Sequence, residues 1–148
     1  MTPILLTTLN SRYIHTSLGL RYLFTNSAPA IQSQTKLIEL TIQAAPAETA
    51  AQLLSEKPQI IGFGIYIWNV QHTLEIIRKI KAQAPEICII LGGPEVSYET
   101  TEMEIVTLAD YVIQGEADFL WNSFCEKFLH GDRPPTKIIR GDLPEISK

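Results

Sequence analysis

One apolar segment constrains the fold of this chain more than any other. Residues 59–68 read QIIGFGIYIW, with no charged side chain and with β-branched or aromatic residues at most positions. A run of this kind is typical of a central strand in a parallel sheet, because both faces of such a strand are covered. The run is too short to cross a membrane as a helix, and two glycines interrupt it. We therefore expect an α/β protein with this segment in the middle of its sheet and no membrane span.

Further strand-like segments alternate with helix-like segments along the chain. Strands are predicted over residues 3–9, 34–40, 86–91 and 110–114. Helical spacing of apolar residues predicts helices over residues 16–26, 47–56, 70–84 and 99–108, and a last one through Leu120, Phe124 and Phe128 that ends near Gly131. Strands joined by crossover helices form a parallel sheet with helices on both faces. The fold class expected is α/β, a doubly wound, five-stranded, flavodoxin-like or Rossmann-like sheet in the order 2-1-3-4-5.

Composition and charge narrow the class of protein. The chain has 148 residues, 45% hydrophobic and 19% charged, which is the size and composition of one globular domain. Its net charge of −4 offers no basic stripe, so we expect no nucleic-acid partner. The amino terminus lacks the features of a secretory signal, and we expect a cytoplasmic location. Cys88 and Cys125 both lie in apolar stretches, where a free cysteine packs as a small hydrophobe.

The carboxyl-terminal segment differs in composition from the rest of the chain. Residues 132–148 contain Pro134-Pro135, a short run of mixed polarity and a second turn-like segment. This composition fits either a linker or an added strand that leads out of the domain. We therefore place the domain at residues 1–131 and interpret residues 132–148 as a connection toward a further domain of a longer polypeptide.

Ligands of open parallel sheets bind beyond the carboxyl ends of the strands. In this chain residues 10–15, 62–69, 92–97 and 114–118 are expected at that edge. Gly62 and Gly64 interrupt the central strand, and glycine there indicates either close approach by a ligand or tight packing of a helix on the sheet. Gly92 and Gly93 follow the fourth strand, and they fit either a ligand-facing loop with free N–H groups or a simple turn.

Several common uses of this fold are excluded by the loop after the first strand. Residues 7–12 (TTLNSR) hold no carboxylate, as a magnesium-dependent receiver domain would require. No glycine occurs between Met1 and Leu18, so the G-x-G-x-x-G motif of dinucleotide-binding domains is absent. The same loop is a poor match to an FMN phosphate loop. His15 lies in this region, and its imidazole either reaches a metal, caps a helix or faces solvent.

Four segments are informative when they are taken together, namely NSRYIHTSLGL from residue 10, GFGIY from residue 62, LGGPE from residue 91 and YVIQGEAD from residue 111. They resemble the N-terminal cobalamin (B12)-binding domain of B12-dependent radical SAM proteins. Members of that family are often named anaerobic Mg-protoporphyrin IX monomethyl ester oxidative cyclases or B12-dependent methyltransferases. The Gly-Gly-Pro after the fourth strand and the DYVIQGEAD run at the fifth strand are the strongest elements. In order and spacing, these segments cover nearly the whole chain.

The resemblance implies a cobalamin-binding module. In that family the corrinoid lies across the carboxyl ends of the strands and its nucleotide tail runs beside the central strands. The cofactor-binding residues implied here are Asn10, Arg12, Tyr13, His15, Gly62, Gly64, Tyr66, Trp68, Gly92, Gly93, Pro94, Glu95, Gly115 and Glu116. Gly62, Gly64, Gly92 and Gly93 would then share one purpose, which is to make room for the tail.

Two departures from related motifs limit what this chain does. In the Asp-x-His-x-x-Gly motif of other B12 domains the aspartate orients a cobalt-ligating histidine, whereas this chain has Tyr13 before His15 and Leu18 after it. The metal assignment of His15 to cobalt therefore lacks its usual support. The Cys-x3-Cys-x2-Cys motif that holds a [4Fe–4S] cluster is also absent. S-adenosylmethionine and the cluster would belong to a C-terminal radical SAM domain of the same polypeptide.

A second function stays open at this point. The chain could be a degenerate domain that binds no cofactor and acts as a docking or substrate-recognition unit, since fold alone does not establish function. A pocket floored by Gly92 and Gly93 would favour cofactor binding. A cleft filled by Tyr13, Tyr66 or Trp68 would favour the degenerate domain.

Overall fold

The computed structural model describes residues 3–10, 24–25, 27–41, 43–65, 70–92, 104–115, 118–133 and 137–141, and the account below concerns these residues. In this part of the chain, six strands form one parallel sheet in the order β2-β1-β3-β4-β5-β6. The strands are β1 (Ile4–Asn10), β2 (Thr35–Thr41), β3 (Ile60–Gly64), β4 (Cys88–Gly92), β5 (Tyr111–Gly115) and β6 (Ile138–Gly141). The predicted parallel, doubly wound sheet and its order 2-1-3-4-5 are confirmed.

The sheet has six strands, which corrects the expected five. The added strand, β6, lies within residues 132–148. The sequence fitted two interpretations of this segment, a linker or an added strand. Within β6, Ile138 and Ile139 pair with Val112 and Ile113 of β5. Only four residues long, β6 is too short for periodicity to identify it. The position of a domain boundary near residue 131 stays a prediction.

The expected central strand lies where the sequence placed it. β3 is hydrogen-bonded to β1 on one side and to β4 on the other, and all five of its residues are buried. It ends at Gly64, earlier than the predicted end at Trp68, and residues 66–69 lie outside the described residues.

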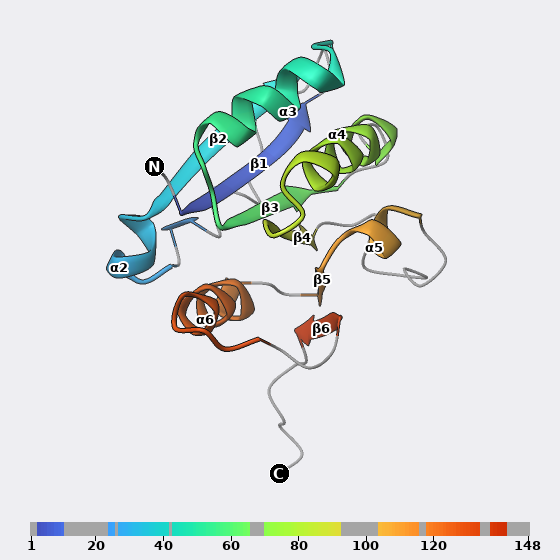
Figure 1. Ribbon diagram of the computed structural model, residues 1–148. Helices are drawn as coiled ribbons and strands as arrows, with labels where there is room; N and C mark the ends of the chain where they lie inside the picture. Colours follow the sequence, from blue (N-terminus) through green and yellow to red (C-terminus); the bar gives the residue numbers. More distant parts are fainter. Residues whose placement is uncertain are drawn as a thin grey trace.

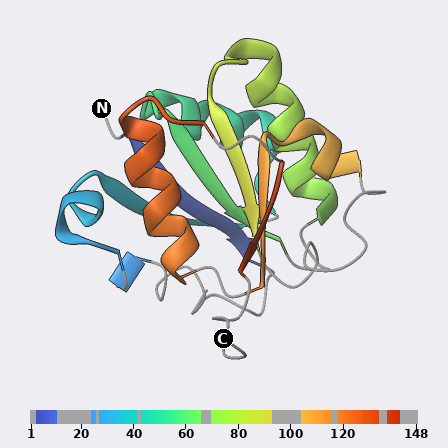
Figure 2. The ribbon, with the colours of Figure 1, turned by 90° about the horizontal axis from the view of Figure 1, so that it is seen from below.

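Helices cover both faces of the sheet. They are α2 (Pro29–Gln32), α3 (Pro46–Ser55), α4 (Val70–Gln83), α5 (Glu104–Leu108) and α6 (Asp118–Leu129). Figure 1 shows α3 and α4 on one side of the sheet and α2 and α6 on the other. Seen from below, α6 lies in front of the sheet (Figure 2). None of the helices in the described segments has the length and apolar character needed to span a bilayer.

Alternation along each strand divides the apolar residues between two cores. Leu5, Ile61 and Ile89 point toward α3, α4 and α5. The opposite face contributes to a core beneath α6, which comprises Ile4, Leu6, Ile31, Ile60, Cys88, Ile90, Ile113, Trp121, Phe124, Cys125 and Phe128. The even-numbered residues of β3, which include Gly62 and Gly64, therefore face α6.

Most predicted helices form, although their bounds differ. Pro46 occupies the first turn of α3, where its missing N–H requires no partner. Described helix α5 covers the last five residues of the predicted 99–108 segment. The short helix α2 was not predicted because four residues carry too little periodicity. The predicted helix over residues 16–26 lies almost wholly outside the described residues.

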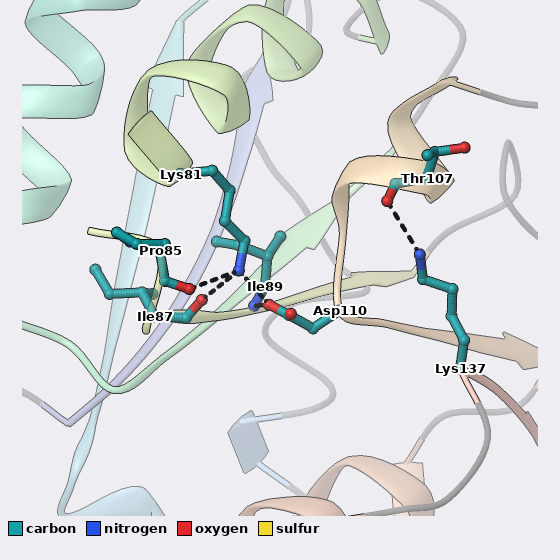
Figure 3. A network of polar contacts seen from close by, with 7 residues as sticks. All are labelled: Lys81, Pro85, Ile87, Ile89, Thr107, Asp110 and Lys137. Carbon is teal, nitrogen blue, oxygen red and sulfur yellow. Dashed lines mark hydrogen bonds and ion pairs between the residues drawn. The ribbon is translucent and has the colours of Figure 1, made fainter. Parts of the chain in front are cut away.

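A polar network fastens the amino ends of β4 and β5 to the end of α4 (Figure 3). The Lys81 ammonium donates to the Ile87 carbonyl at 2.8 Å and to Asp110 Oδ2 at 2.6 Å. The same carboxylate oxygen accepts from the Ile89 N–H at 2.8 Å. Nearby, the Lys137 ammonium donates to the Thr107 carbonyl at 3.1 Å. These contacts are structural, and they lie at the end of the sheet opposite to the expected ligand edge.

Candidate functional site

Three small residues lie side by side at the carboxyl end of the sheet, on the face that α6 covers. Thr8 of β1 is in register with Gly64 of β3, and Gly64 is in register with Gly92 of β4. Because residues in register on parallel strands point to the same face, this row presents almost no side-chain volume across three strands. We refer to Thr8, Gly64 and Gly92 as the small-residue row.

Hydrogen bonds hold the small-residue row in place. The buried Thr8 hydroxyl donates to the Gly64 carbonyl at 2.9 Å. The Ile65 N–H donates to the Gly92 carbonyl at 2.7 Å, which continues the ladder past the end of β3. The hydroxyl bond satisfies a polar group that burial would otherwise penalise. The row is therefore a fixed part of the sheet.

Gly62 and Gly92 have different surroundings. A Cβ atom on Gly92 would meet, among the described residues, only the Ile113 carbonyl oxygen at 3.9 Å, an ordinary contact. A Cβ atom on Gly62 would lie 2.7 Å from Cη2 and 2.8 Å from Cζ3 of Trp121. At Gly62 the close approach of Trp121 accounts for the glycine, as the packing interpretation expects. Contact of Gly62 with a cofactor stays a prediction. At Gly92, packing against the described residues supplies no reason for glycine.

Trp121 is the residue that sequence reasoning missed. It lies in the first part of α6, where Trp121, Phe124 and Phe128 follow at helical spacing and face the sheet. The residue is 1% exposed, and its Nε1 has no hydrogen-bond partner among the described residues. Periodicity could have placed the ring on the buried face. Its position over Gly62 depends on how α6 docks, which no local pattern reveals.

The structure places some of the other predicted site residues. Asn10 ends β1 opposite Thr41, and Gly115 ends β5 opposite Gly141, so both lie at the carboxyl edge. The remaining predicted residues lie outside the described residues, namely Arg12, Tyr13, His15, Tyr66, Trp68, Gly93, Pro94, Glu95 and Glu116. Of the predicted set, Gly64 and Gly92 are therefore brought together directly, with Gly62 one layer further from the edge.

Both cysteines belong to the core beneath α6. Cys88 is 4% exposed and Cys125 is fully buried, which confirms that they pack as small hydrophobes. Burial, reinforced by the Asp110 carboxylate, raises the pKa of the Cys88 thiol to about 12. Burial also raises the pKa of the Cys125 thiol. Neither thiol is prepared for nucleophilic or ligand chemistry at neutral pH.

A family comparison agrees with this geometry. The model of the B12 binding domain matches residues 4–119, which span β1 through the start of α6. The chain belongs to the B12 binding domain family. Within the part of this B12 domain that is described, the small-residue row lies at the edge where open parallel sheets bind their ligands.

Two solved structures share the fold. One is a 1.5 Å crystal structure of a novel cobalamin-binding protein from Desulfitobacterium hafniense DCB-2, with a TM-score of 0.60 and 15% identity over 85% of this chain. The other is the radical S-adenosylmethionine methyltransferase TsrM from Kitasatospora setae, with tryptophan substrate and a SAM analogue bound. Its TM-score is 0.67, at 17% identity over 93% of this chain.

The B12 domain spans 58% of the first of these proteins and 28% of the second. At these identities the likeness concerns the fold. The search of curated proteins returned no match.

Proposed function

We propose that this domain binds cobalamin across the carboxyl ends of its strands, with the nucleotide tail over the small-residue row. Membership of the B12 binding domain family supports the choice of ligand. The single observation that carries the placement is the open side of Gly92, where an added Cβ would meet only a carbonyl oxygen at 3.9 Å among the described residues. The row fits a flat or extended group because Gly64 and Gly92 have no side chains.

The residues of the domain bind and orient the cofactor, and bound cobalamin supplies the cobalt-centred chemistry. The row itself consists of a threonine and two glycines, so it offers shape and exclusion of water instead of groups for proton transfer. Leu6 and Ile90, in the next layer of the sheet, form apolar surroundings. We place Asn10, Gly115 and the predicted residues outside the described segments around the corrin ring.

We further propose that the domain is one part of a B12-dependent radical SAM enzyme, either a methyltransferase or an oxidative cyclase. S-adenosylmethionine and the [4Fe–4S] cluster would bind in a C-terminal domain of the same polypeptide, reached through residues 132–148. The resemblance of four segments to radical SAM relatives supports this proposal. So does the likeness in fold to part of TsrM, which is a radical SAM methyltransferase.

One observation favours a second candidate function. The indole of Trp121 fills the space beside Gly62, which a tail lying deep in the sheet would need. If bulky side chains close the whole cleft in this way, the domain is a docking or substrate-recognition unit without a cofactor. Cobalamin binding separates the two functions directly.

The test is a titration of the purified chain with hydroxocobalamin and with methylcobalamin, followed by removal of free cofactor and visible absorbance. We expect retention of about one corrinoid per chain. Gly92→Leu should weaken binding at least about tenfold, because the new side chain enters the space assigned to the tail. Gln59→Leu adds the same side chain at the exposed amino end of β3, and it should bind as the parent does.

Two results would contradict the proposal. Equal binding of cobalamin by the Gly92→Leu and Gln59→Leu variants would mean that the nucleotide tail does not lie over the small-residue row. Failure of both the purified chain and the full-length protein to retain cobalamin would establish the docking unit instead.

The prediction that His15 ligates cobalt has its own readout. The visible spectrum of bound cobalamin depends on the nitrogen below the cobalt, so the spectra of the parent and of His15→Ala are compared at saturation. A shifted spectrum in the variant indicates ligation by His15. An unchanged spectrum assigns this histidine to the loop.

A further inference from the structure

Strand β6 lies outside the part of the chain that the family model matches. The B12 binding domain model matches residues 4–119, which end at the start of α6, whereas β6 is formed by Ile138–Gly141. β6 nevertheless continues the same sheet, because all four of its residues pair in parallel with β5. The described sheet is therefore one strand wider than the part that the family comparison covers.

The direction of β6 brings its last residue to the ligand edge. A helix that connects two parallel strands starts at the carboxyl end of the first and returns to the amino end of the second, as α6 does between β5 and β6. β6 then runs toward the carboxyl ends of the strands, and Gly141 is in register with Gly115. Gly115 ends β5 and is one of the predicted cofactor-binding residues. The end of β6 therefore lies beside a residue that is already proposed as a cofactor contact.

Gly115 and Gly141 lie on the face of the sheet that α6 covers. Ile113 and Ile139 are in register two positions earlier, and both pack in the core beneath α6. Successive residues of a strand alternate between faces, so Gly115 and Gly141 share the face of Ile113. The Ile113 carbonyl oxygen would lie 3.9 Å from a Cβ atom on Gly92. The Gly115–Gly141 pair is therefore one layer further out than the small-residue row, roughly 6.6 Å along the strand. Neighbouring strands lie about 4.8 Å apart, so a flat ring that rests on Gly115 is within contact distance of Gly141.

We infer that the end of β6 is part of the cofactor site, where the backbone of Gly141 borders the corrin ring beside Gly115. This inference rests on the proposed function, and it adds a strand beyond the matched residues 4–119 to the binding edge. It also divides the edge into two parts. The corrin ring lies against the outer pair, Gly115 and Gly141, whereas the nucleotide tail lies over the small-residue row one layer deeper.

Backbone signals of the glycines report the contact directly. The chain contains eight glycines, so protein labelled with ¹⁵N-glycine gives at most eight amide signals, and single substitutions such as Gly141→Ala assign them. Cyanocobalamin and dicyanocobinamide are both diamagnetic, and the second lacks the nucleotide. We expect the Gly115 and Gly141 signals to shift with both corrinoids, and the Gly64 and Gly92 signals to shift with cyanocobalamin only. Gly131 follows the end of α6 and is exposed, and its signal should stay in place with both.

Affinities provide the second readout. Gly141→Leu places a side chain at the proposed border of the corrin ring, so we expect roughly fivefold weaker binding of both corrinoids. Gly92→Leu should weaken the binding of cyanocobalamin alone, because only the nucleotide tail meets the small-residue row. Lys137→Leu is the matched control, since it adds the same side chain at the amino end of β6 and removes only an exposed hydrogen bond to the Thr107 carbonyl. It should bind both corrinoids as the parent chain does.

The outcomes are distinguishable. Binding of cyanocobalamin without a shift of the Gly141 signal overturns this inference and leaves the proposed function intact. The same holds if the Gly141 signal responds to cyanocobalamin alone, since β6 would then border the tail and not the corrin ring. Equal affinities of Gly141→Leu and Lys137→Leu would also overturn it. Failure of both corrinoids to bind the parent chain overturns the proposed function and this inference with it.

Discussion

Gly62 and Gly92 share a residue type and a sheet face, and their substitution should still have different consequences. Gly62→Ala places a methyl group 2.7 Å from the Trp121 ring, and forced overpacking costs about 1–3 kcal/mol of unfolding free energy. Gly92→Ala meets an ordinary 3.9 Å contact, and its effect should stay within about 0.5 kcal/mol. Urea unfolding of the two variants measures the difference. Equal destabilisation would show that Trp121 yields to the added methyl group.

The sequence indicated both glycines and left open whether packing or a ligand required each one. The answer at Gly62 depends on Trp121, which reaches β3 only because α6 packs across the sheet. Gly92, one strand further along, has no such neighbour among the described residues. Local patterns therefore locate the ligand edge of this fold, whereas the distinction between its residues requires the docking of helices.

The two buried thiols predict a pH dependence of stability. The pKa of Cys88 rises from 9.0 to about 12 on folding, and the pKa of Cys125 also rises. Above pH 9 the unfolded chain releases thiol protons that the folded chain retains, so the free energy of unfolding should fall between pH 9 and pH 12. Urea unfolding across this range measures the fall. A double Cys88→Ala, Cys125→Ala variant should show a shallower fall, and an unchanged slope would mean that other groups cause it.

At the scale of elements, the Lys81–Asp110 pair should matter more than a surface pair. Asp110 accepts from both Lys81 and the Ile89 N–H, so Asp110→Ala leaves a backbone donor and a lysine without their acceptor. We expect a loss of about 1–3 kcal/mol of unfolding free energy, and a smaller loss for Lys81→Met. Lys36→Met breaks an exposed pair with Glu56 and should cost less than about 0.5 kcal/mol. Equal losses in urea unfolding for Asp110→Ala and Lys36→Met would contradict this ranking.

A helix or strand could be predicted where its pattern of apolar residues extends over many consecutive residues. β3 is apolar throughout, and α4 repeats its buried residues at helical spacing, so both were anticipated. The short elements α2 and β6 were not assigned, because four residues hold about one turn or two alternations. The order of the strands was predicted from the match of five alternating units to the flavodoxin-like fold, which is a property of the whole sheet.

At the scale of the whole molecule, the two ends of the sheet carry different kinds of residue. The network of Lys81 and Asp110 ties the amino ends of β4 and β5 with charged side chains. The carboxyl ends carry Thr8, Gly64 and Gly92, which contribute little side-chain volume. The proposed function therefore uses the end of the sheet with little side-chain volume and leaves the charged network at the other end to stabilise the fold. In parallel sheets the carboxyl end is the one where loops are free to vary.

The boundary of the domain is also a property of the whole molecule. It can be measured by comparing chains that end before and after β6. Ile138 and Ile139 are half-buried against the sheet and its cores, and the Val112 N–H donates to the Lys137 carbonyl at 2.9 Å. A chain of residues 1–131 loses these contacts, whereas a chain of residues 1–141 keeps them. We expect the shorter chain to be less stable by about 2 kcal/mol, from two partly buried isoleucines.

Urea unfolding compares the two chains, and hydrogen exchange at the Val112 amide reports the lost strand directly. Faster exchange together with lower stability would place β6 inside the domain, so that any connection to a further domain begins after Gly141. Equal stability and exchange would support the boundary predicted at residue 131. In that case β6 would be an accessory strand, and the sheet that holds the small-residue row would end at β5.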